Sequence, residues 1–301
     1  MRKKVVIFIG GTSYSGSTML DMMLSNHSNS FSLGEVSALY RPYRPHHFNP
    51  TCGCDDAGCL IWTQLKEAGE HGLYIRAFEM FPEVNYLIDS SKNQWWIKTQ
   101  SERLLSEGIE VKHLLISKSP ESFAHSMLKR GQKGWKRAWI NYQKQYLTLI
   151  PDAYPILYDS LTEDTVSRLK RICEYIDLTY EVGMEDFWNK THHTLFGNNS
   201  TKVHLRKNTG SADTDSYRKI YNKKDQVHDE LPLEVMKEIQ DNKDIGALWH
   251  FLVSRDKEGM DNELFKVSQI TYGHGEMLLY SASDIIKRMI GIIIGRYYNL
   301  F

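Results

Sequence analysis

The segment GGTSYSGST, residues 10–18, combines glycines with hydroxyl side chains in a spacing that can bind a phosphate group. Its frame, G-x-x-x-x-G-x-T, is formed by Gly11, Gly16 and Thr18 and follows the apolar run at residues 5–9. A strand, a glycine-rich turn and a helix start direct backbone N–H groups and the positive end of a helix dipole toward one anion. The residues predicted to hold that anion are Ser13, Tyr14, Ser15, Gly16, Ser17 and Thr18.

The loop lacks the lysine that nucleoside triphosphatases carry after the second glycine, because Ser17 occupies that position. In those enzymes the lysine reaches the β- and γ-phosphates, and the next hydroxyl holds Mg²⁺. The segment YLIDSSK places Lys92 where the metal ion would lie. The loop therefore favours a ligand with a single 5′-phosphate and no metal. A P-loop kinase or NTPase is the alternative.

Residues 10–36 resemble the 5′-phosphosulfate loop of sulfotransferases that use 3′-phosphoadenosine-5′-phosphosulfate (PAPS). The resemblance is strongest to bacterial members with Y-S-G-S-T, which are related to carbohydrate and tyrosylprotein sulfotransferases. It implies a three-layer α/β/α, P-loop-NTPase-like fold and transfer of a sulfuryl group to a hydroxyl or, less often, an amine, with release of the bisphosphate PAP. Many relatives carry Arg or Lys where Tyr14 stands.

The same resemblance implies where the rest of the donor binds. Lys118, with Ser126 eight residues later, matches the family's 3′-phosphate site, although the family's usual residue at the first position is arginine. Lys129 and Arg130 could supplement this site, and Arg206 and Lys207 could lie over the nucleotide.

Two residues are predicted to act in the chemical step. Lys92, in a D-S-S-K segment like that of bacterial relatives, is expected to stabilise the negative charge on the leaving oxygen. Glu35 occupies the family's base position, and His125 and Asp89 are the fallback bases. A faint further resemblance covers residues 192–198, and a protein that binds PAP without catalysis is a second alternative.

Cys52, Cys54 and Cys59 lie close together, with His46 and His47 shortly before them. Three thiols and an imidazole can make a tetrahedral zinc site. The C-x-C spacing differs from the common C-x-x-C pairs, so loop packing is the favoured interpretation. Structural zinc and a redox-sensitive pair are the alternatives, and no metal is expected to take part in the reaction.

Four short apolar runs alternate with stretches of helical spacing, which is typical of βαβ units and a parallel sheet. Such sheets bind ligands at the carboxyl ends of their strands, where the polar segments described above begin. We expect a single domain over residues 1–301, in which 36–83 form an irregular excursion on the acceptor side and 255–301 a helical tail. The predicted strands are residues 5–9, 85–89, 111–117 and 154–159, and the predicted helices are residues 95–105 and 162–176.

The composition narrows the classes of partner. Lys+Arg and Asp+Glu both total 37 in 301 residues, which argues against a broad attraction to nucleic acid. Four cysteines fit a reducing compartment, and no run reaches the roughly 18 apolar residues of a membrane span. We expect a cytoplasmic protein with a small-molecule or carbohydrate acceptor. Residues 283–301 are expected to be a packed terminal helix, with membrane-surface or partner contact as the alternative; the acceptor's identity and the oligomeric state are not readable.

Overall fold

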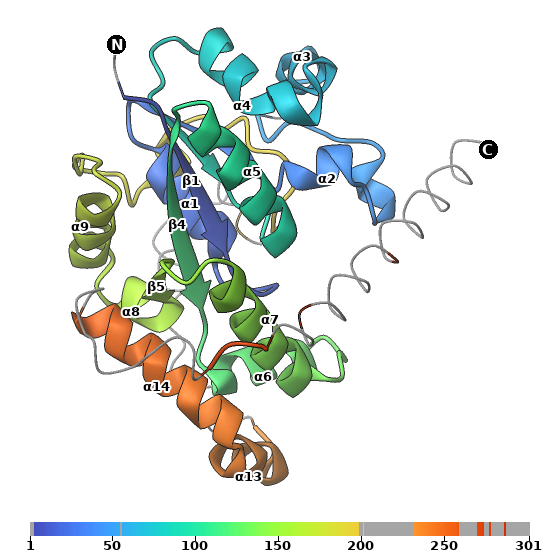
Figure 1. Ribbon diagram of the computed structural model, residues 1–301, viewed down its shortest axis with the longest axis vertical. Coiled ribbons are helices and arrows are strands. Elements are labelled where there is room, and N and C mark those ends of the chain that lie inside the picture. Colours follow the sequence, from blue (N-terminus) through green and yellow to red (C-terminus); the bar gives the residue numbers. More distant parts are fainter. Residues whose placement is uncertain are drawn as a thin grey trace, which may run out of the picture.

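The computed structural model describes residues 3–54, 56–198, 201, 231–258, 270–273, 277 and 286. Its centre is a sheet of five parallel strands in the order β2-β3-β1-β4-β5. β1 and β4 run side by side through the middle of the molecule (Figure 1). The bounds are Val5–Gly10 for β1, Ser30–Gly34 for β2, Tyr86–Asp89 for β3, Glu110–Ser117 for β4 and Tyr154–Leu157 for β5. The predicted parallel sheet is confirmed, and β2 is a strand that the sequence analysis did not predict.

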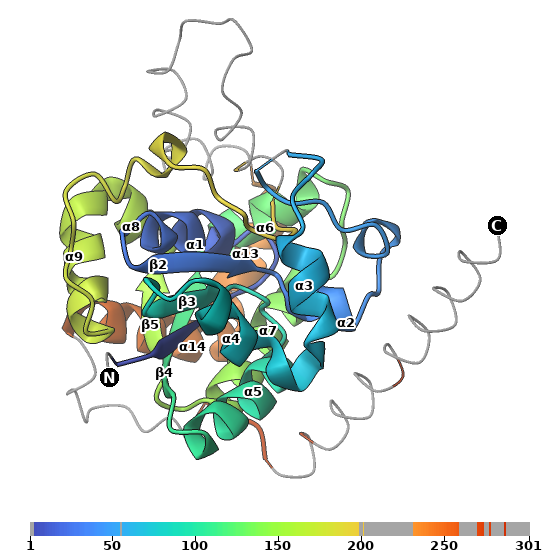
Figure 2. The ribbon, with the colours of Figure 1, turned by 90° about the horizontal axis from the view of Figure 1, so that it is seen from above.

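Helices cover both faces of the sheet, which confirms the predicted three-layer architecture. Val5, Ile7 and Ile9 of β1 pack against α1 (Ser17–Ser25) and α9 (Thr165–Tyr175). The alternate residues Val6 and Phe8 face the second hydrophobic cluster, which includes side chains of α4 (Gly69–Met80), α5 (Gln94–Ser106), α7 (Trp135–Leu149) and α14 (Lys243–Glu258). Seen from above, α1 lies on one side of the strands, and α4 and α5 lie on the other (Figure 2).

Local capping residues explain where several helices begin. Asn93 accepts a hydrogen bond from the Trp96 N–H at the start of α5. Ser119 does the same for α6 (Pro120–Leu128), whose first residue is a proline, the position where a missing N–H costs nothing. Further helices are α8 (Tyr158–Glu163), α13 (Leu233–Asp241) and the short 3₁₀ helix η2 (Phe187–Asn189). The predicted strand 154–159 ends at Leu157, because the next residue starts α8.

The segment 36–83 is more regular than predicted. It contains α2 (Ser37–Tyr40), the 3₁₀ helix η1 (Pro45–His47), α3 (Ile61–Glu67) and α4. Leu73, Tyr74, Ala77 and Phe78 are buried on one face of α4 and belong to the main core. The expectation of an irregular excursion is therefore wrong for residues 61–80, which cover one face of the sheet.

The strand order places a ligand crevice at a defined point. The connection after β1 leads through α1 to β2 at one edge, whereas the connection after β4 leads through α6 and α7 to β5 at the other. Because β1 and β4 are neighbours, their following loops diverge, and ligands of open α/β sheets bind at such points. Within the described residues, no helix has the length and apolar composition needed to cross a membrane.

Candidate functional site

The loop after β1 has the geometry of a phosphate-binding turn. Gly16 is the N-cap of α1 with φ of 94°, and Tyr14 also has a positive φ of 68°. No side chain caps the first turn of α1, so its N–H groups remain directed at the loop. A Cβ on Gly16 would lie 2.4 Å from the Tyr158 ring, so both its backbone conformation and its packing require glycine.

Buried hydroxyl groups surround this loop. Thr12 Oγ1, Ser15 Oγ and Ser117 Oγ are buried and have no hydrogen-bond partner among the described residues. A buried hydroxyl without a partner costs about 1–3 kcal/mol. An anion with several acceptor oxygens would satisfy such donors, so the loop fits a phosphate or sulfate group.

The predicted cation–hydroxyl pair after β4 is brought together. Lys118 Nζ lies 3.3 Å from Ser126 Oγ and 4.7 Å from the centroid of the Tyr158 ring, the same ring that packs on Gly16. Trp139 Nε1 donates to the Lys118 carbonyl at 3.1 Å and fixes the main chain. No described carboxylate forms an ion pair with the Lys118 ammonium. Burial lowers the Lys118 pKa to about 8, the charge of Arg130 acts in the same direction, and Asp159 opposes the shift.

Arg130 brings a second cation to the loop. Its guanidinium carbon lies 4.1 Å from the centroid of the Tyr14 ring, and its Nη1 donates to the Ser126 carbonyl at 2.6 Å. A cation–π contact of this kind holds the charge beside the anion-binding turn. The sequence analysis named Arg130 only as a supplement, and it treated Tyr14 as the loss of a cation.

Glu35 and Lys92 form an ion pair at the carboxyl ends of β2 and β3. Lys92 Nζ lies 2.5 Å from Glu35 Oε1, and the two side chains are 18% and 16% exposed. Lys92 has φ of 61°, a left-handed conformation that costs a non-glycine residue about 1–3 kcal/mol. The Tyr142 hydroxyl donates to the Lys92 carbonyl at 2.7 Å and accepts from the Gly11 N–H at 2.7 Å. The base and the cation predicted from the sequence are thus adjacent, and Tyr142 fixes them relative to the loop.

Asp89, one of the fallback bases, is not accessible to an acceptor. It is completely buried, and its carboxylate accepts hydrogen bonds from the Tyr74 hydroxyl at 2.6 Å, Trp96 Nε1 at 2.9 Å and the Ser91 N–H at 2.8 Å. Burial raises its pKa, and these donors oppose the shift. Asp89 joins α4 and α5 to the end of β3 and has a structural role.

Residues 192–198, here called the crossing segment, contact the site in a way that the sequence does not predict. The Leu195 carbonyl accepts from the Glu35 N–H at 2.9 Å, and the Asn198 N–H donates to Thr18 Oγ1 at 3.1 Å. A Cβ on Gly34 would lie 2.1 Å from the Leu195 carbonyl oxygen, so the two chains are in close contact there. The crossing segment therefore holds the backbone of Glu35 and the first turn of α1. Arg206, Lys207 and most of residues 197–229 and 255–301 lie outside the described residues.

The three clustered cysteines meet a histidine of the crossing segment. The ligand atoms of Cys52, Cys54, Cys59 and His193 all lie within 4.8 Å of one another. Burial lowers the pKa of His193 and raises that of Cys52. The histidines expected near the cysteines are elsewhere: His47 packs against His46 and Phe196.

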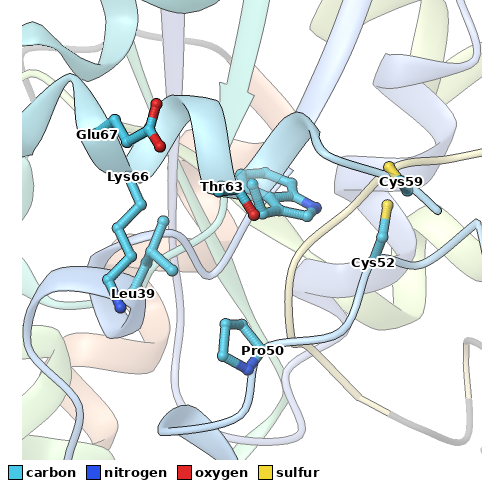
Figure 3. A pocket seen from close by; sticks show the side chains of 8 residues that line it. Leu39, Pro50, Cys52, Cys59, Thr63, Lys66 and Glu67 are labelled. Atoms are coloured by element: carbon cyan, nitrogen blue, oxygen red, sulfur yellow. The ribbon is translucent and has the colours of Figure 1, made fainter. Parts of the chain in front are cut away.

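A cleft of about 490 Å³ opens beside these cysteines. Figure 3 shows the sulfur atoms of Cys52 and Cys59 pointing toward each other at one side of the cleft, with Leu39 and Lys66 farther along it. Its lining residues are Leu39, Pro50, Cys52, Cys59, Trp62, Thr63, Lys66 and Glu67.

Neither a family model nor a curated protein sequence matches the chain. Two similar solved structures are sulfotransferase domains. The domain from the curacin biosynthetic pathway is 16% identical, with a TM-score of 0.45 over 80% of this chain and 98% of the other. The domain from the Synechococcus PCC 7002 olefin synthase is 15% identical, with a TM-score of 0.47 over 79% of this chain and 95% of the other.

Proposed function

We propose that the chain is a sulfotransferase that moves a sulfuryl group from PAPS to a hydroxyl or amine acceptor. The observation that carries the proposal is a phosphate-binding loop without lysine, accompanied by cations from two other strand ends. Lys92 follows β3 and is bound to Glu35, and Lys118 follows β4 and is bound to Ser126. A donor that carries charged groups at both the 5′ and the 3′ position of its ribose needs two such anion sites.

Each part of the donor has a set of residues that fits it. The loop from Ser13 to Thr18 would hold the 5′-phosphosulfate through backbone N–H groups and hydroxyls. Lys118 and Ser126, with Arg130 beside them, would hold the 3′-phosphate. A role for Arg206 and Lys207 over the nucleotide remains a prediction.

The chemistry needs a base and a stabilised leaving group. The acceptor oxygen forms a bond to sulfur while the bond from sulfur to the bridging oxygen breaks, and its electron pair stays on the 5′-phosphate of PAP. The acceptor proton passes to Glu35. Because protonation neutralises the Glu35 carboxylate, the Lys92 charge that it balanced becomes available to the developing phosphate.

A kinase or NTPase is less well supported by the site. Ser17 replaces the phosphate-gripping lysine, and the carboxylate at the end of β3, Asp89, is buried and already accepts three hydrogen bonds. Among the described residues, therefore, the loop lysine is replaced and the carboxylate at the end of β3 is not available to Mg²⁺.

The acceptor class is proposed from the cleft beside α2 and α3. Its volume lies within the range of sites for small molecules, and it combines apolar residues with Thr63, Lys66 and Glu67. A small molecule or a carbohydrate unit fits this composition. A cytoplasmic location without a nucleic-acid partner remains part of the proposal.

The test compares ligands and then transfer. Calorimetry with PAP, AMP and ATP plus Mg²⁺ should show the tightest binding for PAP. Incubation with ³⁵S-labelled PAPS and a panel of glycans, lipids and phenols should then give a labelled product. Tight binding of ATP with Mg²⁺ and none of PAP would refute the proposal, and PAP binding without transfer to any acceptor would indicate a non-catalytic binding protein.

A further inference from the structure

Three sulfur atoms and one imidazole nitrogen converge at one side of the proposed acceptor cleft, which Cys52 and Cys59 also line. Cys52 Sγ lies 3.4 Å from His193 Nδ1, and Cys59 Sγ lies 3.6 Å from the same nitrogen. Cys54 Sγ completes the group, in which all four atoms lie within 4.8 Å of one another. The sulfurs come from one loop and the nitrogen from the crossing segment, so the group joins two distant parts of the chain.

The distances match the edges of a tetrahedral metal site. Zinc bonds of about 2.3 Å to sulfur and 2.0–2.1 Å to nitrogen give edges of about 3.6 Å between sulfur and nitrogen and about 3.8 Å between sulfurs. Both sulfur–nitrogen distances to His193 lie close to this edge. A hydrogen bond accounts for only one of these two short distances, because a ring nitrogen has a single lone pair that can accept one thiol hydrogen.

The chemistry of the four atoms selects the metal class. Three soft thiolates and an imidazole suit zinc, whereas magnesium and calcium prefer oxygen ligands. No carboxylate belongs to the group. Three sulfurs and one nitrogen fill the four positions of tetrahedral zinc, which is typical of structural rather than catalytic sites.

The backbone around the group is already paired across the two segments. Cys52 and Leu195 form an antiparallel bridge, and the Gly53 N–H donates to the Thr194 carbonyl at 3.0 Å. A Cβ on Gly53 would lie 2.9 Å from Thr194, so glycine permits this close approach. A metal ion bound to the four side chains would add coordinate bonds between the two segments that these backbone hydrogen bonds already join.

We propose that Cys52, Cys54, Cys59 and His193 bind one structural zinc ion that fastens the cysteine loop to the crossing segment. The crossing segment also holds the Glu35 N–H and the Thr18 hydroxyl. Zinc therefore stabilises the position of the base and of the anion-binding turn without contacting either. This reverses the loop-packing interpretation that the cysteine spacing favours, and it does not depend on the proposed sulfotransferase activity.

The first experiment measures metal in the purified full-length chain. Mass spectrometry of metals should find one zinc per chain, and Co²⁺ substitution should give the intense visible bands of a tetrahedral site with sulfur ligands. Cys54→Ser and His193→Ala should lose both signals. Their affinity for zinc should fall by more than the roughly 10–100-fold that follows the replacement of a residue hydrogen-bonded to a metal ligand. Cys173→Ala and His46→Ala are the controls and should retain them, because these residues lie outside the group.

The second experiment measures stability, so that the result does not rest on activity. A strong chelator should lower the melting temperature of the wild-type chain and of the two controls, but not that of Cys54→Ser. Sub-stoichiometric zinc after reconstitution under reducing conditions would overturn the proposal, as would a Cys52–Cys59 disulfide in the purified chain or an unchanged Co²⁺ spectrum in His193→Ala. PAP titrations run in parallel separate the two proposals. A purified chain that binds PAP but does not bind zinc would refute only the metal site.

Discussion

Replacing Lys118 by alanine should weaken the binding of PAP while leaving the binding of AMP almost unchanged. The two ligands differ by the 3′-phosphate, and Lys118 is the residue that we assign to that group. Its ammonium is held by Ser126 and by the Tyr158 ring, and no described carboxylate forms an ion pair with it. The charge is therefore available to a ligand, and its removal should lower the affinity only for a ligand that carries the second phosphate.

The size of the effect follows from the environment of the side chain. A hydrogen bond to a charged group contributes about 1.5–3 kcal/mol, which corresponds to about 10–150-fold in the dissociation constant. Lys118 is half-buried, so solvent screens its charge less than that of an exposed lysine. With a pKa of about 8, the side chain is still mostly protonated at pH 7. We therefore expect the PAP dissociation constant to rise about 10–150-fold and the AMP constant to change less than about threefold.

Calorimetry on the wild-type chain and two variants provides the assay. Lys98→Ala removes the same charge from a partly exposed position on α5, where Lys98 pairs with Glu102, and should leave both affinities unchanged. Melting temperatures establish that the variants are folded. An equal loss for PAP and AMP would show that Lys118 supports the whole site, and unchanged PAP binding would place the 3′-phosphate elsewhere. Either result would refute the assignment.

Three further predictions concern the base, the link between the strand ends and the pH dependence. Glu35→Gln should lower turnover about 10²–10⁴-fold at saturating donor with PAP affinity retained, and full turnover would exclude Glu35 as the base. Tyr142→Phe removes the hydroxyl that joins the Gly11 N–H to the Lys92 carbonyl. This variant should have a free energy of unfolding about 1–3 kcal/mol lower in urea titrations. An unchanged free energy of unfolding would show that this link does not stabilise the fold. Because only protonated Lys118 binds an anion and its pKa is about 8 in the free chain, PAP affinity should be full below that pH and about tenfold weaker at pH 9 than at pH 7. Lys118→Arg, which stays charged, should remove this pH dependence, and an equal slope in both chains would contradict the reasoning.

The fold could be predicted where a strand is apolar throughout. β1 and β5 are buried along their whole length, as are the last three residues of β3 and the last five of β4, and each of these segments contains a short apolar run. β2 has the sequence SFSLG, in which Ser30 and Ser32 are buried polar residues, so it gave no such run. Helix α4 was missed for a different reason: its buried residues Leu73, Tyr74, Ala77 and Phe78 follow the polar start GEHG, which contains two glycines.

The site could be predicted where its residues are close in sequence. Lys118 and Ser126 are joined by one turn and a helix start, so a local pattern is sufficient to bring them together. The contacts of the crossing segment with Glu35 and with the cysteines join residues more than 130 positions apart. No local periodicity encodes such a pairing, and for this reason the imidazole of the metal group was sought at His46 and His47.

Tyr14 shows why the type of one residue can mislead when its neighbours in space are unknown. From the sequence, an aromatic residue in place of Arg or Lys weakens the case for a phosphosulfate loop. In the structure the ring supports the Arg130 guanidinium, and Gln132 Nε2 donates to its hydroxyl at 3.3 Å. Because Arg130 also donates to the Ser126 carbonyl, one cation lies between the loop and the predicted 3′-phosphate residues. The positive charge absent from β1's loop is therefore supplied by the residue two positions after the end of α6, where it contacts both Tyr14 and Ser126.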